Sequence, residues 1–348
     1  MKKTALTIIL NFVLLLPTSA SALELGLHMD ITTYKDAAYR ANFIPKAKSI
    51  NATVSRNSFL WHLIEPTKGV YDWSIPDSVV NELLKAGIEP LFCILGSPTW
   101  ANGVSSSTNK YFLYVPTDEA QFELWVKNYE TFVKAAVNRY AGKVKKWELW
   151  NEQNECCFWL PRAKTADPYI FWFQKIQSAI KYIDPNAEVA LGGLSAIQYT
   201  GKQFLTEMYT KNIFPDIVAI HPYSATAPND YQPSPEGNFD DISTIRDLMV
   251  KYGQGDKKLW VTEWGWSTAK ISEQIQAEWL RISLGMLQNK YSYVSLATYF
   301  TDVDKLPNLN YGLFNSDFQA KPSALVFKEF SNSIKIPAVP NNLQIIGQ

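Results

Sequence analysis

Two glutamates end apolar segments in positions from which they could act together on one bond. Glu152 ends the run 147–152, and Glu263 ends the run 259–263 and is followed by Trp264. Burying a lone carboxylate is unfavourable, so a glutamate in such apolar company should have a functional reason. Two carboxyl groups facing each other across a glycosidic bond can protonate the leaving oxygen and attack the anomeric carbon. Either glutamate alone could instead cap a helix or pair with an arginine.

Eight apolar segments, each followed by a helical pattern, would position these glutamates. They are residues 25–29, 52–56, 88–95, 144–150, 188–192, 217–221, 259–263 and 294–300. Apolar strands alternating with helices indicate a parallel sheet buried on both faces. Eight such units predict an α/β fold of the closed (β/α)8 TIM barrel type. The two glutamates then end the fourth and seventh strands, at the face where such barrels build active sites.

Helix and loop patterns agree with this barrel. Apolar residues recur every three or four positions over 117–140, and Gly87 ends a predicted helix over 74–86. The links that follow strands are long at 97–116, 155–167 and 224–239, whereas those that follow helices are short. Long loops gathered at one end of a barrel are typical of a binding face.

The composition of the chain indicates which kinds of ligand and partner to expect. The chain has 33 basic and 33 acidic residues and no basic run, so we expect no nucleic acid partner. Aromatic residues make up 14% of the chain, including 12 tryptophans, which favours contact with sugar rings. The three histidines have no ligand spacing, so we predict neither a metal nor a cofactor. The cysteines Cys93, Cys156 and Cys157 are predicted to be free thiols, with a disulfide from Cys93 to one of the pair left open.

The first residues of the chain have the pattern of a signal for export. Two lysines precede an apolar run over 5–16, and Ala20-Ser21-Ala22 offers a cleavage site for signal peptidase. We predict a signal peptide over 1–22, a single barrel domain over 23–333 and a tail over 334–348. The apolar run falls short of the roughly 20 residues that span a bilayer, although an uncleaved anchor is the alternative. The mature chain is expected to be secreted or periplasmic, without a membrane span, and monomeric.

Several motifs in order carry a family resemblance. They are residues 54–56, 61–66, 69–73, 147–152, 221–223 and 262–266. The chain resembles the clan A glycoside hydrolases and, within them, family 39. It is most similar to the short bacterial members of that family that act as exopolysaccharide endoglycosidases, of the Psl type. The resemblance covers nearly the whole chain after the signal peptide.

The resemblance implies roles for particular residues. Glu152 would be the acid/base and Glu263 the nucleophile, and Asn151 would hydrogen-bond the 2-hydroxyl of the sugar. Tyr223 would hold the nucleophile, and Arg56 would keep it ionised through its positive charge. Arg56 could instead only neutralise a barrel carboxylate.

Other residues are predicted to contact the substrate. His221 lies beside Tyr223 on the sixth strand, although a buried core histidine is the alternative. Tyr299 stands on the eighth strand, where clan members place a tryptophan under the sugar. The tryptophans of the loops are candidate sugar platforms, namely Trp61, Trp100, Trp159, Trp264 and Trp266. By their periodicity, Trp125 and Trp147 are predicted to be core residues, and His28 is a weak candidate.

These observations favour a retaining, endo-acting glycoside hydrolase that cleaves a β-linked polysaccharide by double displacement, with a bacterial exopolysaccharide as the expected substrate. Xylosidases and iduronidases of family 39 carry an added β-domain for which this chain is too short, which favours an open groove. Two alternatives remain. One is an exo-β-glycosidase acting on short oligosaccharides, and the other is a non-catalytic polysaccharide-binding protein of an export or assembly system. In each case the partner is a polysaccharide or an oligosaccharide.

Overall fold

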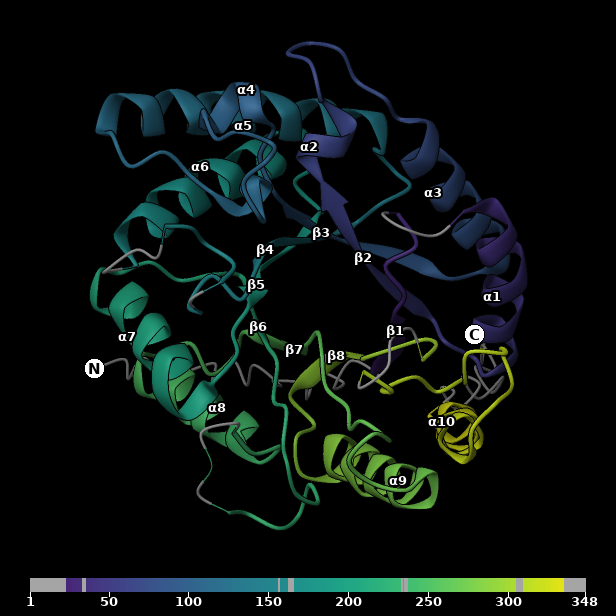
Figure 1. The fold of residues 1–348 in the computed structure, drawn as a ribbon. Helices are drawn as coiled ribbons and strands as arrows, with labels where there is room; N and C mark the ends of the chain where they lie inside the picture. Colours follow the sequence, from purple (N-terminus) through teal and green to yellow (C-terminus); the bar gives the residue numbers. More distant parts are fainter. Residues whose placement is uncertain are drawn as a thin grey trace, which may run out of the picture.

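The computed structural model describes residues 23–32, 36–155, 157–161, 166–232, 234, 237–304 and 309–334. In this part of the chain, parallel strands pair in sequence order and close into a barrel, with β1 pairing β8 (Figure 1). The strands are β1 (Glu24–His28), β2 (Val54–Leu60), β3 (Glu89–Leu95), β4 (Lys146–Asn151), β5 (Glu188–Gly193), β6 (Ile217–Ile220), β7 (Lys258–Val261) and β8 (Val294–Tyr299). The predicted (β/α)8 barrel is confirmed.

Helices surround the strands on the outside of the barrel (Figure 1). The longer ones are α1 (Ala37–Ser49), α3 (Ser74–Ala86), α5 (Glu119–Arg139), α6 (Asp167–Ile183), α7 (Lys202–Thr210), α8 (Asp241–Lys251), α9 (Glu273–Asn289) and α10 (Pro322–Ser333). Short helical segments lie in the loops, namely α2 (Trp61–Ile64), α4 (Thr99–Asn102), the 3-10 turn η1 (Tyr111–Leu113) and the π turn η2 (Ile197–Gly201).

Two helix predictions can be compared residue by residue. The helix predicted over 74–86 has those bounds, and Gly87 ends it in the left-handed region with φ of 74°, which glycine adopts without strain. The helix predicted over 117–140 begins later, at Glu119. The carboxylate of Asp118 accepts a hydrogen bond from the backbone N–H of Gln121 at 3.0 Å and so caps the first turn.

Aromatic side chains fill the space between the barrel and its outer helices. Trp147 of β4 and Trp125 of α5 are fully buried, which confirms both as core residues. The ring of Trp125 packs edge-on against Trp159 of the loop after β4, with centroids 5.9 Å apart. Removing such large rings from water is strongly favourable. The loops that carry the predicted site therefore rest on a rigid layer.

An ion cluster closes the opposite end of the barrel, where the strands begin. Lys146 at the start of β4 is 4% exposed, and its ammonium lies 2.5 Å from Glu89, 3.0 Å from Glu24 and 3.3 Å from Glu188. Burial lowers the pKa of Lys146, but the carboxylates of Glu89 and Glu24 outweigh this effect and raise it. The cluster lies far along the strands from the predicted site, so it bears on stability rather than on substrate.

The cysteine prediction needs correction. Cys93 is a free, buried thiol whose Sγ donates to the carbonyl of Trp150 at 3.1 Å, which excludes a disulfide on Cys93. Cys157 is disulfide-bonded, so the prediction of a free thiol is wrong there. The predicted signal peptide and, apart from Ile334, the predicted tail lie outside the described residues. Within the described ranges, no helix has the length and apolar character needed to cross a bilayer.

Candidate active site

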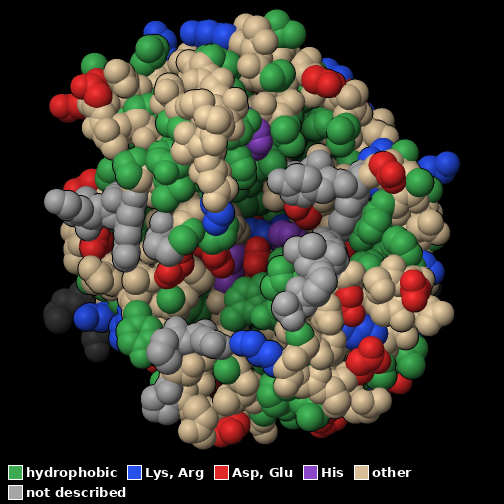
Figure 2. All heavy atoms as spheres, viewed as in Figure 1, with side chains coloured by type: hydrophobic (Ala, Val, Ile, Leu, Met, Phe, Trp, Pro, Cys, Tyr) green, Lys and Arg blue, Asp and Glu red, His purple; other side chains and the backbone are tan. Residues whose placement is uncertain are grey.

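The two predicted glutamates converge at the mouth of the barrel. Glu152 directly follows β4, and Glu263 lies two residues beyond the end of β7. One carboxylate oxygen of each, and one ring nitrogen of His221, all lie within 4.8 Å of one another. Figure 2 shows acidic, basic and histidine side chains gathered in a hollow at the centre of this face. Strands distant in sequence thus bring two carboxylates to one place.

The backbone at the end of β4 turns two consecutive polar side chains toward this hollow. Trp150 and Glu152 have φ values of 76° and 47°, in the left-handed region. Such conformations are unfavourable by about 1–3 kcal/mol each and tend to occur at functional sites. In a regular strand, Asn151 and Glu152 would point to opposite faces. Here Asn151 bonds to Arg56 and Glu152 bonds to His221, so both face the barrel mouth.

Each oxygen of Glu263 has its own donor. The guanidinium of Arg56 donates to Oε1 at 2.6 Å, and the hydroxyl of Tyr223 donates to Oε2 at 2.8 Å. Burial raises the pKa of Glu263, but the charges of His221 and Arg56 and the Tyr223 hydrogen bond outweigh it and hold that pKa at about 2. Glu263 is therefore an ionised carboxylate of fixed orientation, which suits a nucleophile.

Glu148 holds Arg56 in place. Its carboxylate accepts from Nε of Arg56 at 2.6 Å and from Nη2 at 3.1 Å, and both side chains are at most 1% exposed. Nη2 also donates to Oδ1 of Asn151 at 2.8 Å, and Nη1 lies 2.7 Å from Nδ1 of His28. Sequence reasoning missed Glu148 as a site residue. A charged residue inside an otherwise apolar strand was the feature that could have indicated it.

His221 links the two sides of the site. Its Nδ1 lies 2.8 Å from Oε1 of Glu152, and its Nε2 lies 3.1 Å from the hydroxyl of Thr262, which in turn donates to Glu148 at 3.0 Å. Burial lowers the pKa of His221, but the negative charges of Glu263 and Glu152 raise it overall. A Cβ on Gly193 would lie 2.0 Å from Nε2, so only glycine leaves room for the ring.

The aromatic floor predicted at Tyr299 lies one residue further on. Tyr299 is fully buried, with its ring packed against Trp264, and it faces away from the hollow. Phe300 is half-buried, with its ring 5.1 Å from His28 and 6.1 Å from Tyr223. Successive strand residues face opposite sides, so a shift of one position exchanges a core ring for a site ring. The burial of Tyr299 contradicts its predicted contact with substrate, and the ring that lies beside His28 and Tyr223 is that of Phe300.

Most of the predicted tryptophan platforms are core residues instead. Trp61, Trp159, Trp264 and Trp266 are at most 3% exposed. The indole N–H groups of two of them fix loops: Trp61 donates to Glu65 at 2.6 Å, and Trp266 donates to the carbonyl of Thr226 at 3.1 Å. Trp61, Trp159 and Trp264 are therefore core residues rather than sugar platforms, whereas Trp266, although only 3% exposed, lines a hollow beside Tyr223. Trp100 is half-buried and remains a candidate.

Glu152, His221 and Glu263 are close enough together to ligate one metal ion. The surrounding donors oppose this use of the site. Both oxygens of Glu263 already accept hydrogen bonds, one of them from the charged guanidinium of Arg56. A cation at the same place would be repelled by that guanidinium. The donor set therefore fits an ionised carboxylate better than a metal ligand.

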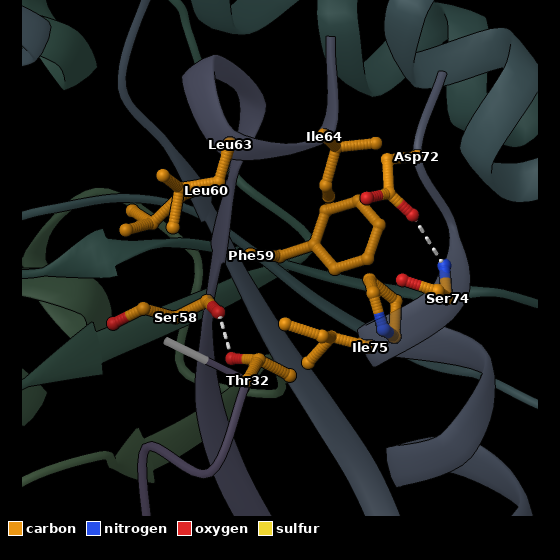
Figure 3. Close-up of a pocket in the computed structure, with 10 residues that line it drawn as sticks. Thr32, Ser58, Phe59, Leu60, Leu63, Ile64, Asp72, Ser74 and Ile75 are labelled. Atoms are coloured by element: carbon orange, nitrogen blue, oxygen red, sulfur yellow. Dashed lines mark hydrogen bonds between the residues drawn. The ribbon is translucent and has the colours of Figure 1, made fainter. Parts of the chain in front are cut away.

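Two further hollows border the catalytic face. One, of about 380 Å³, opens beside the site and is lined by residues that include Tyr223, Trp266 and Tyr311. The other, of about 370 Å³, lies between β2 and α3 (Figure 3). Its lining is mainly apolar, and its polar edge is paired internally, since the N–H of Ser74 donates to Asp72 at 2.9 Å. The aromatic hollow beside Tyr223 therefore suits substrate better than the apolar one.

Comparison with known proteins agrees with this geometry. Residues 162–325 match the family model described as glycosyl hydrolase catalytic core, which confirms the prediction of such a core for that segment. A thermostable celloxylanase of Thermoclostridium stercorarium is 27% identical over 113 residues, which are 30% of this chain and 28% of that protein. The matched segment of the family model includes Glu263 and the strands β5 to β8.

Solved structures share the fold over almost the whole chain. A family 39 glycoside hydrolase from Bacteroides cellulosilyticus superposes with a TM-score of 0.71 at 22% identity, covering 91% of this chain and 64% of that one. A monomeric β-xylosidase from Caulobacter crescentus gives 0.69 at 20%, covering 88% and 67%. An exo-β-1,4-mannosidase from an Opitutaceae bacterium gives 0.63 at 15%, covering 89% and 59%. The resemblance to glycoside hydrolases, family 39 among them, is confirmed in the fold.

Proposed function

We propose that this chain is a retaining, endo-acting glycoside hydrolase that cleaves a β-linked polysaccharide by double displacement. The main support is the short distance between two carboxylates in unequal surroundings. Oxygens of Glu152 and Glu263 lie within 4.8 Å, whereas inverting enzymes separate the two carboxyl groups by about 6.5–9.5 Å to admit water. Glu263 is held ionised by Arg56 and Tyr223, while Glu152 is more exposed and, within the described residues, its carboxylate pairs with His221.

In the first step, Glu263 attacks the anomeric carbon of the bound sugar. The bond from that carbon to the glycosidic oxygen breaks, and Glu152 gives its proton to the departing oxygen. An ester then joins the sugar to Glu263, whose negative charge is consumed. In the second step, Glu152 takes a proton from water, which attacks the anomeric carbon on the face opposite the ester. The carboxylate of Glu263 is released, and the anomeric configuration is retained.

Asn151 is suited to bind the sugar ring during both steps. Its Oδ1 accepts from Arg56 at 2.8 Å, which orients the amide. Its Nδ2 makes no hydrogen bond within the described residues, so it can donate to the 2-hydroxyl. Hydrogen bonds to this hydroxyl strengthen in the transition state of glycoside hydrolysis. Phe300 supplies an aromatic surface beside the same position, next to His28 and Tyr223.

We propose a bacterial exopolysaccharide as the substrate and the periplasm or the exterior as the place of action. The predicted signal peptide over 1–22 and the resemblance to exopolysaccharide endoglycosidases support this assignment. The aromatic hollow beside Tyr223 continues the site toward the loops after β6 and β7, as a polymer substrate requires. Equal numbers of acidic and basic residues suit a neutral or weakly charged polymer.

Reducing-end release from bacterial exopolysaccharides, β-glucans, xylans and mannans tests the proposal. Glu263→Gln removes the nucleophilic charge but keeps the size of the side chain, so it should abolish release while the protein stays folded. Proton NMR of the first product should show the β-anomer. Release of monosaccharides alone would identify an exo-acting enzyme. Binding without release from any polymer would replace the proposal with a polysaccharide-binding protein.

A further inference from the structure

His62 is a histidine of the catalytic face that the proposed reaction does not use. It lies in α2, directly after β2, the strand that carries Arg56. The residue is 8% exposed. A structural histidine this deeply buried normally hydrogen-bonds through at least one ring nitrogen. His62 makes no such bond within the described residues, and its Nδ1 is a buried nitrogen without a partner.

Two aromatic residues of the loop after β3 hold the imidazole. Its ring stacks on Phe112 at 4.4 Å with an angle of 14°, and it meets Tyr111 edge-on at 5.6 Å. Its Nδ1 rests against Gly96, where a Cβ would lie 3.0 Å away. Gly96 has φ of 85°, a conformation that favours glycine. The ring is therefore held in one orientation by neighbours that offer it no hydrogen bond.

This orientation leaves one polar atom for a ligand. Burial lowers the pKa of His62 to about 4, so the imidazole is neutral near pH 7. A neutral ring carries its proton on a single nitrogen. Since Nδ1 is buried without an acceptor, the favoured tautomer carries the proton on Nε2. Nε2 is not among the buried unpaired nitrogens of the described residues, so this N–H reaches solvent.

His62 packs beside the end of β3, the strand that neighbours β4. Ile94 of β3 pairs with Leu149 of β4. Gly96, which supports the imidazole, lies two residues after Ile94, just beyond the end of β3. Asn151 lies two residues after Leu149, at the end of β4. Phe112 is attached to the same rim, because its carbonyl accepts from the N–H of Ser97 at 2.7 Å. His62 thus borders the face on which a polymer would extend beyond the scissile bond.

We propose that His62, Tyr111 and Phe112 form a sugar-binding subsite at the rim above β2 and β3, which binds a pyranose unit away from the cleaved bond. The Nε2–H group donates to a hydroxyl or ring oxygen of that sugar, and the half-buried rings of Tyr111 and Phe112 offer apolar surface to its C–H groups. Aromatic faces beside a single polar donor are a common design for binding sugar rings. This inference rests on the proposed function, because it takes a polysaccharide as the ligand.

Chain-length dependence tests the subsite. The probes are p-nitrophenyl β-xyloside, β-glucoside and β-mannoside, together with the β-1,4-linked oligosaccharides of the same sugars from two to six units. His62→Phe keeps the stacked ring but removes the donor, whereas His62→Gln keeps a side-chain N–H. Tyr182→Ala is the matched control, because Tyr182 is 84% exposed on the outer surface of α6. Circular dichroism and melting curves establish that each variant is folded.

We expect kcat/KM of His62→Phe to stay within about twofold of wild type on p-nitrophenyl glycosides. On the longest oligosaccharides it should fall about tenfold, equivalent to about 1.4 kcal/mol. His62→Gln should recover part of this loss, and Tyr182→Ala should change neither value. Equal losses on short and long substrates would show that His62 only shapes the catalytic centre. Unchanged kinetics on every length would also overturn the subsite.

The two proposals fail in different ways. If the wild type hydrolyses none of these compounds or the polymers, the proposed function fails. The subsite is then judged by titrating wild type and His62→Phe with the hexasaccharides in a calorimeter. Weaker binding by His62→Phe would support it, whereas equal affinities, or no binding by wild type, would overturn it.

Discussion

Replacing Tyr223 with phenylalanine removes a single hydroxyl from the site. That hydroxyl donates to Oε2 of Glu263 at 2.8 Å, while Oε1 keeps its bond to Arg56. Phenylalanine preserves the ring, which packs near Phe300 and Tyr311 with centroids about 6 Å away. We therefore expect a folded protein in which one oxygen of the nucleophile has lost its donor.

The two chemical steps should respond differently. Glu263 loses its charge when the glycosyl ester forms and regains it when the ester is hydrolysed. A hydrogen bond to a charged group contributes about 1.5–3 kcal/mol, and about 1.4 kcal/mol corresponds to a factor of ten. Hydrolysis of the ester, in which the carboxylate reappears, should therefore slow by about 10- to 100-fold. Ester formation should slow much less, because the lost bond stabilised the charge that this step consumes.

Rapid-mixing kinetics with a dinitrophenyl glycoside of a sugar that the wild type cleaves would measure both steps. Tyr223→Phe should release about one equivalent of dinitrophenol in a burst, followed by a slow steady state, and the glycosyl ester should be visible by intact mass. The variant also removes one group that lowers the pKa of Glu263. Because the carboxylate form is the active one, the loss of activity at acid pH should begin at a higher pH than in wild type.

A different pattern would refute this reasoning. If ester formation slows as much as ester hydrolysis, no burst appears, and Tyr223 then acts by orienting the nucleophile rather than by stabilising its charge. Steady-state rates equal to those of wild type would make Tyr223 a packing residue. An unfolded variant would be detected by its melting curve, and substrate-induced stabilisation would show that the site is intact.

Three other predictions concern Glu152 as the general acid, the effect of removing metal ions, and the ion cluster around Lys146. Glu152→Ala should lose about 100-fold or more on natural linkages but far less on dinitrophenyl glycosides, whose leaving groups need little acid help; equal losses measured on both would reassign Glu152. Incubation with EDTA should leave hydrolysis rates unchanged, and inactivation that added metal reverses would point to a metal-dependent site. Lys146→Met should lower the free energy of unfolding by about 1–3 kcal/mol at pH 7 with kcat unchanged, because Glu24, Glu89 and Glu188 would then repel one another. In urea titrations this difference should shrink as pH falls below about 4, where glutamates become protonated, and a constant difference would assign the loss to packing.

Local patterns in the sequence were sufficient to predict the barrel and the positions of its two glutamates at strand ends. Apolar strands alternating with helices require a sheet covered on both faces, and eight such units close it. A carboxylate at the end of an apolar strand is visible without any structure, because strand ends lie at the surface. Glu152 and Glu263 could therefore be placed on one face by counting strands. The helix over 74–86 could equally be predicted from the sequence, since Gly87 marks its end.

Other features depended on contacts between segments distant in sequence. Glu148 pairs with Arg56 across 92 residues, and only the closed barrel shows that this pair fixes Glu263. Whether a loop tryptophan faces substrate or core depends on what packs over it, and for Trp61 that is α5, through Phe132.

The sequence by itself determined the fold class and the pair of carboxylates, because both follow from the order of apolar and polar residues along the chain. Only the tertiary structure decided which side chains hydrogen-bond to these carboxylates and pack beside them. Phe300 rather than Tyr299 lies beside His28 and Tyr223, because a strand side chain changes face at every residue. The left-handed φ values at Trp150 and Glu152 are likewise seen only in the folded chain. Those choices depend on register and burial, which arise only when the strands have closed on one another.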